Sequence, residues 1–255
     1  MENLTGGREG ITRKGDVVIR PAGPWSVAVH KFLKHLHDEG FHHAPIPLGL
    51  DSNGNEQVSF VAGTVNNYPY PSTVKSEEAL VSAAKLLRNY HDAAESFITP
   101  ETRTLPWMMP AREPSEVIVH GDYAPYNVAL KGNQAVGMID FDTAHPAPRL
   151  WDIAYAVYRW APLSDQEHAF VVELGDQIQR TKLFCDAYDL KRADRERLVQ
   201  TVIERMNTFV NFMRVEAANG NEKFIGNLRD GHHLIYLKDI NYLTANRKQI
   251  VAGIL

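Results

Sequence analysis

The sequence lacks the features that define several classes of protein. Its 255 residues include one cysteine, Cys185, so an internal disulfide cannot form, as is usual in a reducing cytoplasm. No apolar run reaches the roughly 18 residues that a membrane-spanning helix needs. The first ten residues, MENLTGGREG, have no apolar segment of the kind found in signal peptides. We therefore expect a cytoplasmic protein without a membrane partner.

An excess of positive charge is also missing. The chain has 27 Lys and Arg against 31 Asp and Glu, a net charge of -4, and no run of like charges stands out. Nucleic-acid binders present a basic face, so we expect no nucleic-acid partner. Hydrophobic residues make up 44% of the chain, which is enough for a core in one large domain or in two lobes around a cleft.

Two short apolar runs each end in a carboxylate. Residues 117–119 lead into the tripeptide His-Gly-Asp at 120–122, and residues 136–139 lead into Asp140. An amide side chain, Asn127, lies five positions after the first carboxylate. If the two runs pair as strands, all three polar side chains meet at one end of a single hairpin.

Such a set is what phosphoryl transfer from a nucleotide requires. One carboxylate accepts the proton of the attacking hydroxyl, while an Asn oxygen and a second carboxylate hold magnesium on the phosphates. The step of five residues matches the protein-kinase catalytic loop. A lone Asp would more simply be a turn residue. The three together predict Asp122 as the catalytic residue, Asn127 and Asp140 as Mg²⁺ ligands, and a nucleotide as phosphate donor.

The amino-acid sequences of these motifs resemble those of the aminoglycoside phosphotransferase and choline kinase family, which shares the protein-kinase fold. The strings are HGDYAPYNV at 120–128, MIDFD at 138–142 and PRLWDIA at 148–154. The resemblance implies an α+β, two-lobed, protein-kinase-like fold. Residues 1–63 would form a small antiparallel β lobe with one helix that binds the nucleotide, and residues 64–255 a larger, mainly helical lobe for catalysis and the acceptor.

The same resemblance implies roles for three further residues. Asp152, in the third string, would brace the catalytic loop, and His120 would support that loop by hydrogen bonding. Asp142 follows Phe141, where protein kinases have glycine, so it would either reach the metal or cap the next turn.

A glycine-rich segment near the N-terminus is the expected phosphate cover. Gly6, Gly7 and Gly10 precede two short predicted strands at 11–13 and 17–20. Backbone N–H groups of such loops bind anions. A flexible tail is the alternative, and the strands that follow favour the phosphate interpretation.

Arg20 ends the second of these strands, where the kinase fold has a phosphate-binding Lys. Arginine can bind phosphate with two parallel hydrogen bonds, although it is not a simple substitute for lysine. A surface Arg is the alternative. The Glu that should hold this cation from the next helix is missing, since the helix offers His30 and His35 there.

Residues 58–63 would form the hinge between the lobes, with backbone groups of Phe60 and Ala62 facing the purine. Backbone recognition leaves no mark in the sequence, so ATP and GTP remain equal candidates. The acceptor would be held by helices of the C-terminal third. Residues 164–255 contain 13 acidic and 13 basic residues, so no acidic excess indicates a polycationic aminoglycoside.

We therefore expect a kinase that moves the γ-phosphate of ATP or GTP to a hydroxyl of a small molecule such as an aminoglycoside, a sugar or an amino alcohol. One alternative is a pseudokinase that binds nucleotide and regulates a partner, which the altered Arg20 and the missing Glu favour. Another is a metal phosphohydrolase built on His120, Asp122, Asp140 and Asp142, which lacks the further His ligands that such a centre needs.

Overall fold

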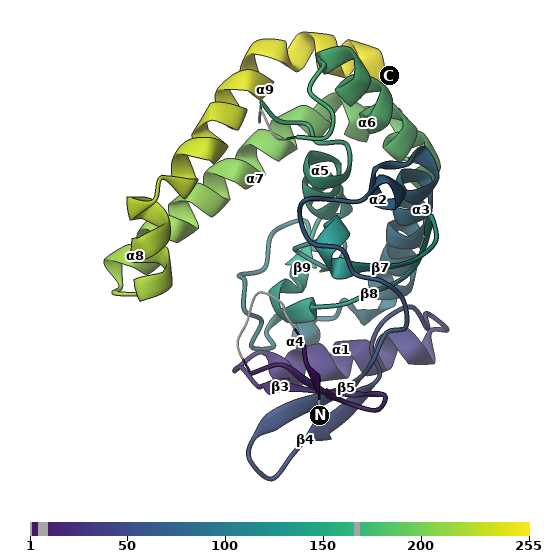
Figure 1. Cartoon of the computed structure of the whole chain (residues 1–255), viewed down its shortest axis with the longest axis vertical. Coiled ribbons are helices and arrows are strands. Elements are labelled where there is room, and N and C mark those ends of the chain that lie inside the picture. Colours follow the sequence, from purple (N-terminus) through teal and green to yellow (C-terminus); the bar gives the residue numbers. More distant parts are fainter. Residues whose placement is uncertain (1, 5–9, 166–168) are drawn as a thin grey trace. The chain divides into compact units, whose positions relative to one another are not determined.

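The computed structural model describes residues 2–4, 10–165 and 169–255 (Figure 1). The chain divides into two compact units, Met1–Asp152 and Ile153–Leu255. The first contains an antiparallel sheet and the second is helical, in agreement with the predicted α+β class. The predicted lobe boundary at residue 63 lies inside the first unit, and it remains a prediction.

An antiparallel sheet forms the N-terminal part of the first unit, in the order β1-β2-β3-β5-β4. Its strands are β1 (Glu2–Asn3), β2 (Thr12–Lys14), β3 (Val17–Pro21), β4 (Pro47–Leu50) and β5 (Asn55–Ser59). The hairpin of β2 and β3 is the one that the sequence predicts. Strands β3 and β5 are adjacent, and their register places Arg20 directly opposite Glu56.

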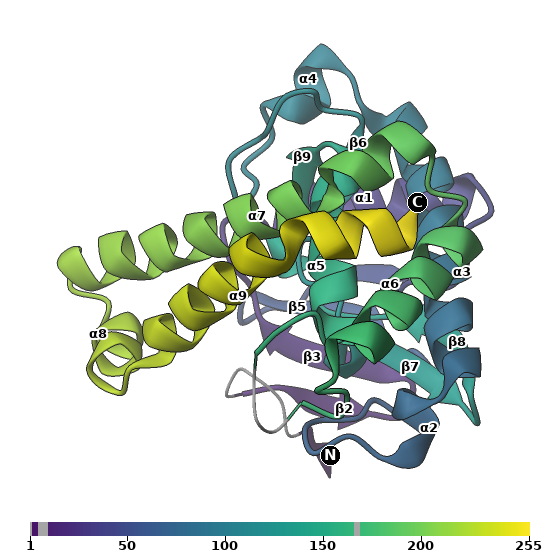
Figure 2. The same ribbon diagram turned by 90° about the horizontal axis from the view of Figure 1, so that it is seen from above.

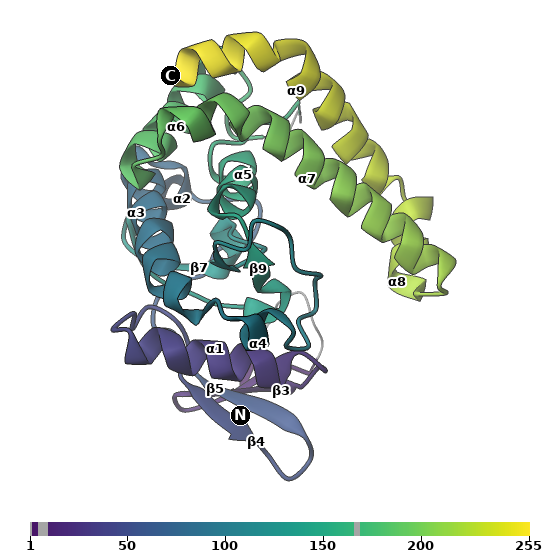
Figure 3. The same cartoon turned by 180° about the vertical axis from the view of Figure 1, so that it is seen from behind.

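Helix α1 (Ser26–Asp38) lies beside this sheet (Figure 3). Its apolar face is buried as the spacing predicts, through Val29, Phe32, Leu33 and Leu36. A serine just before an apolar helical face predicts Ser26 as the cap of this helix, but Ser26 is already the first helical residue. Its hydroxyl instead accepts a hydrogen bond from the Gly23 N–H at 3.0 Å.

Helix α3 (Glu77–Ala94) is the central helix of the first unit. The Ser76 hydroxyl caps it by accepting from the Ala79 N–H at 3.2 Å, as predicted. Helical spacing predicts an inner face of Leu80, Ala84, Leu87 and His91, and all four side chains are fully buried. Shorter helices lie next to it in the chain. They are α2 (Ser72–Lys75) before it, and the 3-10 helix η1 (Glu95–Phe97) and α4 (Pro100–Arg103) after it.

The strands that carry the motifs pair differently from the prediction. They are β6 (Val117–Val119), β7 (Val128–Lys131), β8 (Gln134–Met138) and β9 (His145–Ala147). Strand β6 pairs with β9, and β7 pairs with β8. The single hairpin of the two apolar runs is therefore wrong. A two-residue turn, Gly132-Asn133, joins β7 to β8 locally. Strand β9 contains Pro146, and proline is tolerated in an edge strand.

The second unit is built from long helices. They are α6 (Leu174–Tyr188), α7 (Arg192–Ala218), α8 (Glu222–Arg229) and α9 (His232–Ile254), while α5 (Arg149–Trp160) crosses the division between the units. Helices α7 and α9 lie side by side (Figure 2). The only cysteine of the chain, Cys185, is buried on α6. Within the described residues, no helix has the length and hydropathy that crossing a membrane requires.

Helical spacing predicts an apolar stripe on α7 made of Leu198, Val202, Met206, Phe209 and Met213, and most of it is buried. Leu198, Val202, Met206 and Met213 face the interior of the unit. Phe209 is 38% exposed. Its ring meets the Tyr236 ring edge to face, with the centroids 5.1 Å apart.

Candidate functional site

The predicted catalytic carboxylate is held from two sides by neighbours in its own loop. The Asn127 amide nitrogen donates to Asp122 Oδ2 at 3.0 Å and to the Asp122 carbonyl at 2.9 Å. The Tyr126 hydroxyl donates to Asp122 Oδ1 at 2.6 Å. The 3-10 helix η2 (Pro125–Asn127) brings both donors back toward the carboxylate. Sequence reasoning missed Tyr126, because a lone Tyr beside a motif carries no signal of its own.

Asp140 lies beside Asn127, as the motif spacing requires. The N–H of Ile139 donates to the Asn127 carbonyl at 2.9 Å, and the next residue is Asp140. The register of β7 and β8 sets this contact, since Val128 is opposite Met138. Asp140 has φ 63° and ψ 67°, a left-handed conformation that costs a non-glycine residue about 1–3 kcal/mol. Its side chain is nevertheless 46% exposed, so part of the carboxylate is accessible to solvent.

Below the loop, the buried carboxylate of Asp152 accepts hydrogen bonds from two backbone N–H groups. These are the N–H of His120 at 2.7 Å and that of Gly121 at 3.0 Å. His91, on α3, places its Nε2 3.1 Å from the same carboxylate. Burial lowers the pKa of His91, although Asp152 opposes this effect, so a neutral ring donates to the carboxylate. Asp152 therefore braces the loop, as the resemblance implied.

His120 supports the loop on its other side. Its Nε2 lies 2.9 Å from the Ile139 carbonyl, next to the predicted metal ligand Asp140. The hydroxyl of Thr143 donates to the His120 carbonyl at 3.1 Å. The His120 ring therefore links the catalytic loop to the segment that ends in Asp140, which agrees with the expected supporting role.

Gly121 is the point of closest approach between these two segments. Its φ is +81°, and an added Cβ would overlap the Thr143 carbonyl oxygen. Thr143 belongs to the 3-10 helix η3 (Phe141–Thr143), which follows Asp140. The glycine thus meets a steric requirement as well as a conformational one.

The guanidinium of Arg20 contacts three carboxylates. Its Nε is 2.7 Å from Glu56 Oε1, its Nη1 donates to Asp140 Oδ1 at 2.9 Å, and its Nη2 is 3.0 Å from Asp142 Oδ1. Arg20 is 8% exposed, so it is not the surface residue that was the alternative. Asp142 is an ion-pair partner of Arg20, a role that neither interpretation of the sequence included. Sequence reasoning also missed Glu56.

The remaining predicted nucleotide contacts are less fully described. Gly6 and Gly7 lie outside the described residues, and Gly10 has φ +80°. The N–H of Phe60 donates to the Asp16 carbonyl at 2.8 Å, so it is used within the sheet. Ala62 is exposed next to this strand. Their contact with a purine remains a prediction.

The loop and its neighbours suit a magnesium ion that a nucleotide brings with it. The Asn127 amide nitrogen donates a hydrogen bond to Asp122. The amide oxygen is therefore the atom that could bind a cation beside Asp140. In the described part of the chain, no group of three or more His, Cys, Asp and Glu side chains could hold a metal alone.

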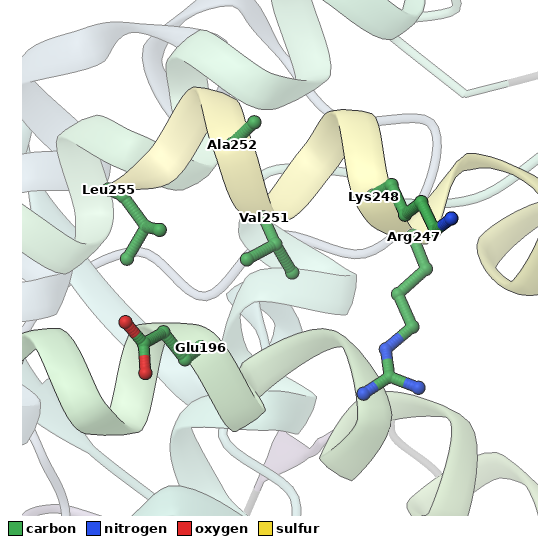
Figure 4. Close-up of a pocket in the computed structure, with 6 residues that line it drawn as sticks. All are labelled: Glu196, Arg247, Lys248, Val251, Ala252 and Leu255. Carbon is green, nitrogen blue, oxygen red and sulfur yellow. The ribbon is translucent and has the colours of Figure 1, made fainter.

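A separate hollow of about 470 Å³ lies on the second unit, between α7 and α9 (Figure 4). Its lining consists of Glu196, Arg247, Lys248, Val251, Ala252 and Leu255. None of the predicted site residues is among them, so this hollow is not the site described above.

Comparisons with known proteins agree with this geometry. The family model of a phosphotransferase enzyme family matches residues 85–184, which include the loop of residues 120–127, Asp140 and Asp152. The trifolitoxin immunity protein of Rhizobium leguminosarum bv. trifolii is 36% identical over 205 residues, which are 78% of this chain and 77% of that protein.

Solved structures share the fold at low sequence identity. A choline/ethanolamine kinase family protein from Mesorhizobium loti has a TM-score of 0.65 at 15% identity, over 99% of this chain and 91% of its own. The GDP complex of wild-type aminoglycoside 2'-phosphotransferase-IIIa has a TM-score of 0.61 at 13% identity, over 96% of this chain and 92% of its own. Together with the loop geometry, these matches show that the chain belongs to the phosphotransferase enzyme family and has the protein-kinase-like fold of the aminoglycoside phosphotransferases and choline/ethanolamine kinases.

Proposed function

We propose that this protein transfers the γ-phosphate of ATP or GTP, in the presence of magnesium, to a hydroxyl group of a small molecule. The observation that carries the proposal is the cluster around Asn127, whose side chain orients Asp122 while its backbone binds the residue before Asp140. A general base and a metal-binding carboxylate are thereby held by one residue.

The chemistry follows from these positions. Asp122 orients the acceptor hydroxyl and takes its proton as the oxygen attacks the γ-phosphorus, while the bond from this phosphorus to the β,γ-bridging oxygen breaks and the nucleoside diphosphate leaves. Tyr126 and Asn127 keep that carboxylate from rotating, which preserves the attack geometry. Magnesium bound at Asn127 and Asp140 would neutralise charge on the phosphates. Arg20 would add donors for the same phosphates from the sheet.

The test is a panel of hydroxylated acceptors incubated with γ-labelled ATP or GTP and Mg²⁺. The panel contains aminoglycosides, sugars and amino alcohols, because the neighbouring structures include one complex with kanamycin, one with gentamicin and a protein named ethanolamine kinase. A labelled product that depends on one acceptor, and that disappears in Asp122→Asn, supports the proposal. Turnover that persists in this variant contradicts it.

The similarity to the trifolitoxin immunity protein adds a further acceptor class to the panel. Because this relative is named for immunity to a toxin, we propose a hydroxyl-bearing toxin as one acceptor class. Phosphorylation would add negative charge and bulk to the toxin and so change what it binds. Trifolitoxin itself belongs in the panel, and mass spectrometry distinguishes a phosphorylated toxin from one that is only bound.

A nucleotide-binding pseudokinase is the second candidate. The observation in its favour is that Arg20 pairs with Asp140 and Asp142, two carboxylates on the segment that would bind magnesium. A pseudokinase would bind Mg-ATP or Mg-GTP with no transfer to any acceptor and no hydrolysis. Phosphate transfer above the Asp122→Asn background excludes it.

Replacing Asp140 with alanine should weaken Mg-nucleotide binding more than replacing Asn127 does. A carboxylate carries the charge that offsets the cation, whereas an amide supplies only a dipole. Calorimetric titration of Mg-ATP and Mg-GTP into Asp140→Ala and Asn127→Ala measures the difference. Affinities that stay at the wild-type value in both variants would remove the two residues from the metal site.

The Arg20→Ala variant should weaken ATP binding roughly 10- to 100-fold relative to adenosine, since a hydrogen bond to a charged group is worth about 1.5–3 kcal/mol. Adenosine has no phosphates, so losing an Arg20–phosphate contact weakens only ATP binding, whereas loss of the fold weakens the binding of both ligands. The ratio of the two affinities therefore distinguishes the two effects. Arg20→Lys should recover part of the ratio, because a point charge still attracts phosphate. An unchanged ratio in Arg20→Ala would show that Arg20 does not bind phosphate.

A further inference from the structure

The β3–β5 register supplies a carboxylate that the sequence pattern does not indicate. Arg20 and Glu56 are opposite each other on adjacent antiparallel strands, so both side chains lie on the same face of the sheet. Glu56 is fully buried, and its Oε1 is 2.7 Å from Arg20 Nε. The pair therefore exists without any contribution from a helix Glu.

Glu56 is also tied to helix α1. The Nε2 of His30, on that helix, is 3.0 Å from Glu56 Oε2. Burial raises the pKa of Glu56, but His30, Arg20 and a hydrogen bond from Ser26 lower it by more, so the net shift is downward and the group is ionised. The helix position that lacks a Glu is thus linked to Arg20 through His30 and Glu56.

The geometry around Arg20 separates two edges of its guanidinium. The Glu56 carboxylate contacts Nε. Nη1 contacts Asp140, and Nη2 contacts Asp142. A lysine carries its three donors on one nitrogen, whereas a guanidinium presents its donors from three separate nitrogens. The three nitrogens of Arg20 can therefore contact Glu56, Asp140 and Asp142 in separate directions.

We propose that Glu56 is the positioning residue for Arg20, so that in this chain a neighbouring strand performs the role that protein kinases give to a Glu of the helix. The inference rests on the proposed function, in which Arg20 binds the nucleotide phosphates. Glu56 does not touch the nucleotide. It fixes the guanidinium from behind so that Nη1 and Nη2 face the phosphates.

The experiment measures Mg-ATP and adenosine affinity by calorimetry in wild type, Glu56→Gln, Arg20→Ala and the double variant. Glu56→Gln should lower the ATP-to-adenosine affinity ratio roughly 10-fold, the lower end for loss of a residue that orients a ligand. The change should disappear in the Arg20→Ala background, because Glu56 acts through Arg20. Val29→Ala is the matched control, since it removes a buried group beside His30 without a polar contact.

Glu56→Asp keeps the charge but shortens its reach, and it replaces Glu56→Gln if the latter does not fold. Its ratio should fall between those of wild type and Arg20→Ala. An unchanged ratio in the folded Glu56 variant, or a drop of equal size with and without Arg20, overturns the proposal. If Arg20→Ala itself leaves the ratio unchanged, the phosphate role of Arg20 fails and the proposal for Glu56 fails with it. If only the Glu56 variants leave it unchanged, the proposed function stands.

Discussion

Replacing Asp122 with asparagine should lower phosphoryl transfer by a factor of ~100 to 10,000, the usual contribution of a positioned general base. Asparagine has the same shape but cannot accept the proton of the acceptor hydroxyl. Tyr126 and Asn127 already surround the side chain, so the fold should remain intact. Nucleotide affinity should change little, because the proposed function assigns Asp122 to the acceptor hydroxyl and not to the nucleotide. Steady-state turnover with the acceptor found in the panel measures the loss.

A matched control separates this effect from the loss of any aspartate. Asp176→Asn changes an exposed aspartate in the first turn of α6. It should alter turnover by no more than about twofold, since exposed substitutions seldom exceed about 0.5 kcal/mol. Near-normal turnover in Asp122→Asn would mean that another group accepts the proton.

Replacing Gly121 with alanine should lower the free energy of unfolding by about 3 kcal/mol or more, and should abolish most turnover. The left-handed backbone alone costs an alanine about 1–2 kcal/mol. The new Cβ also overlaps the Thr143 carbonyl, so the catalytic loop must move away from η3. That movement would strain both hydrogen bonds to Asp152. Urea titration measures the stability, and turnover measures the displacement of the loop.

Gly132→Ala is the control for conformation without crowding. Gly132 also has a positive φ, +57°, but nothing lies within 4 Å of the point that an added Cβ would occupy in the β7–β8 turn. The free energy of unfolding of Gly132→Ala should fall by about 1–2 kcal/mol through backbone strain, and its phosphoryl-transfer activity should remain. Equal losses in the two variants would show that backbone conformation, rather than contact with Thr143, makes glycine necessary at position 121.

The local patterns of the chain were predictable because their causes are local. The buried face of α3 and its Ser76 cap follow from helical spacing and from a hydroxyl at the right position. The sequence also predicted that Asp122, Asn127 and Asp140 lie together, although the β7–β8 pairing, and not the predicted pairing of the two apolar runs, brings the segment of Asp140 to Asn127.

Contacts between distant segments were not predictable in the same way. The pairing of β6 with β9 joins segments on either side of the β7–β8 hairpin, and period-2 patterns do not name a partner strand. Glu56 was missed for the same reason, because only the β3–β5 register puts it opposite Arg20. The protein-kinase pattern places the corresponding Glu on the helix, and nothing in the sequence around residue 56 indicates that a strand supplies it.

The burial of Cys185 gives the second unit a chemical reporter. Burial raises the pKa of its thiol to about 12, and thiol reagents attack the thiolate. Modification at neutral pH should therefore wait for α6 to open, and its rate then measures how often this happens. Because no other cysteine competes for the reagent, this rate reports on the Ile153–Leu255 unit alone. An acceptor bound by these helices would slow the modification, whereas a nucleotide held only by the first unit would leave the rate unchanged.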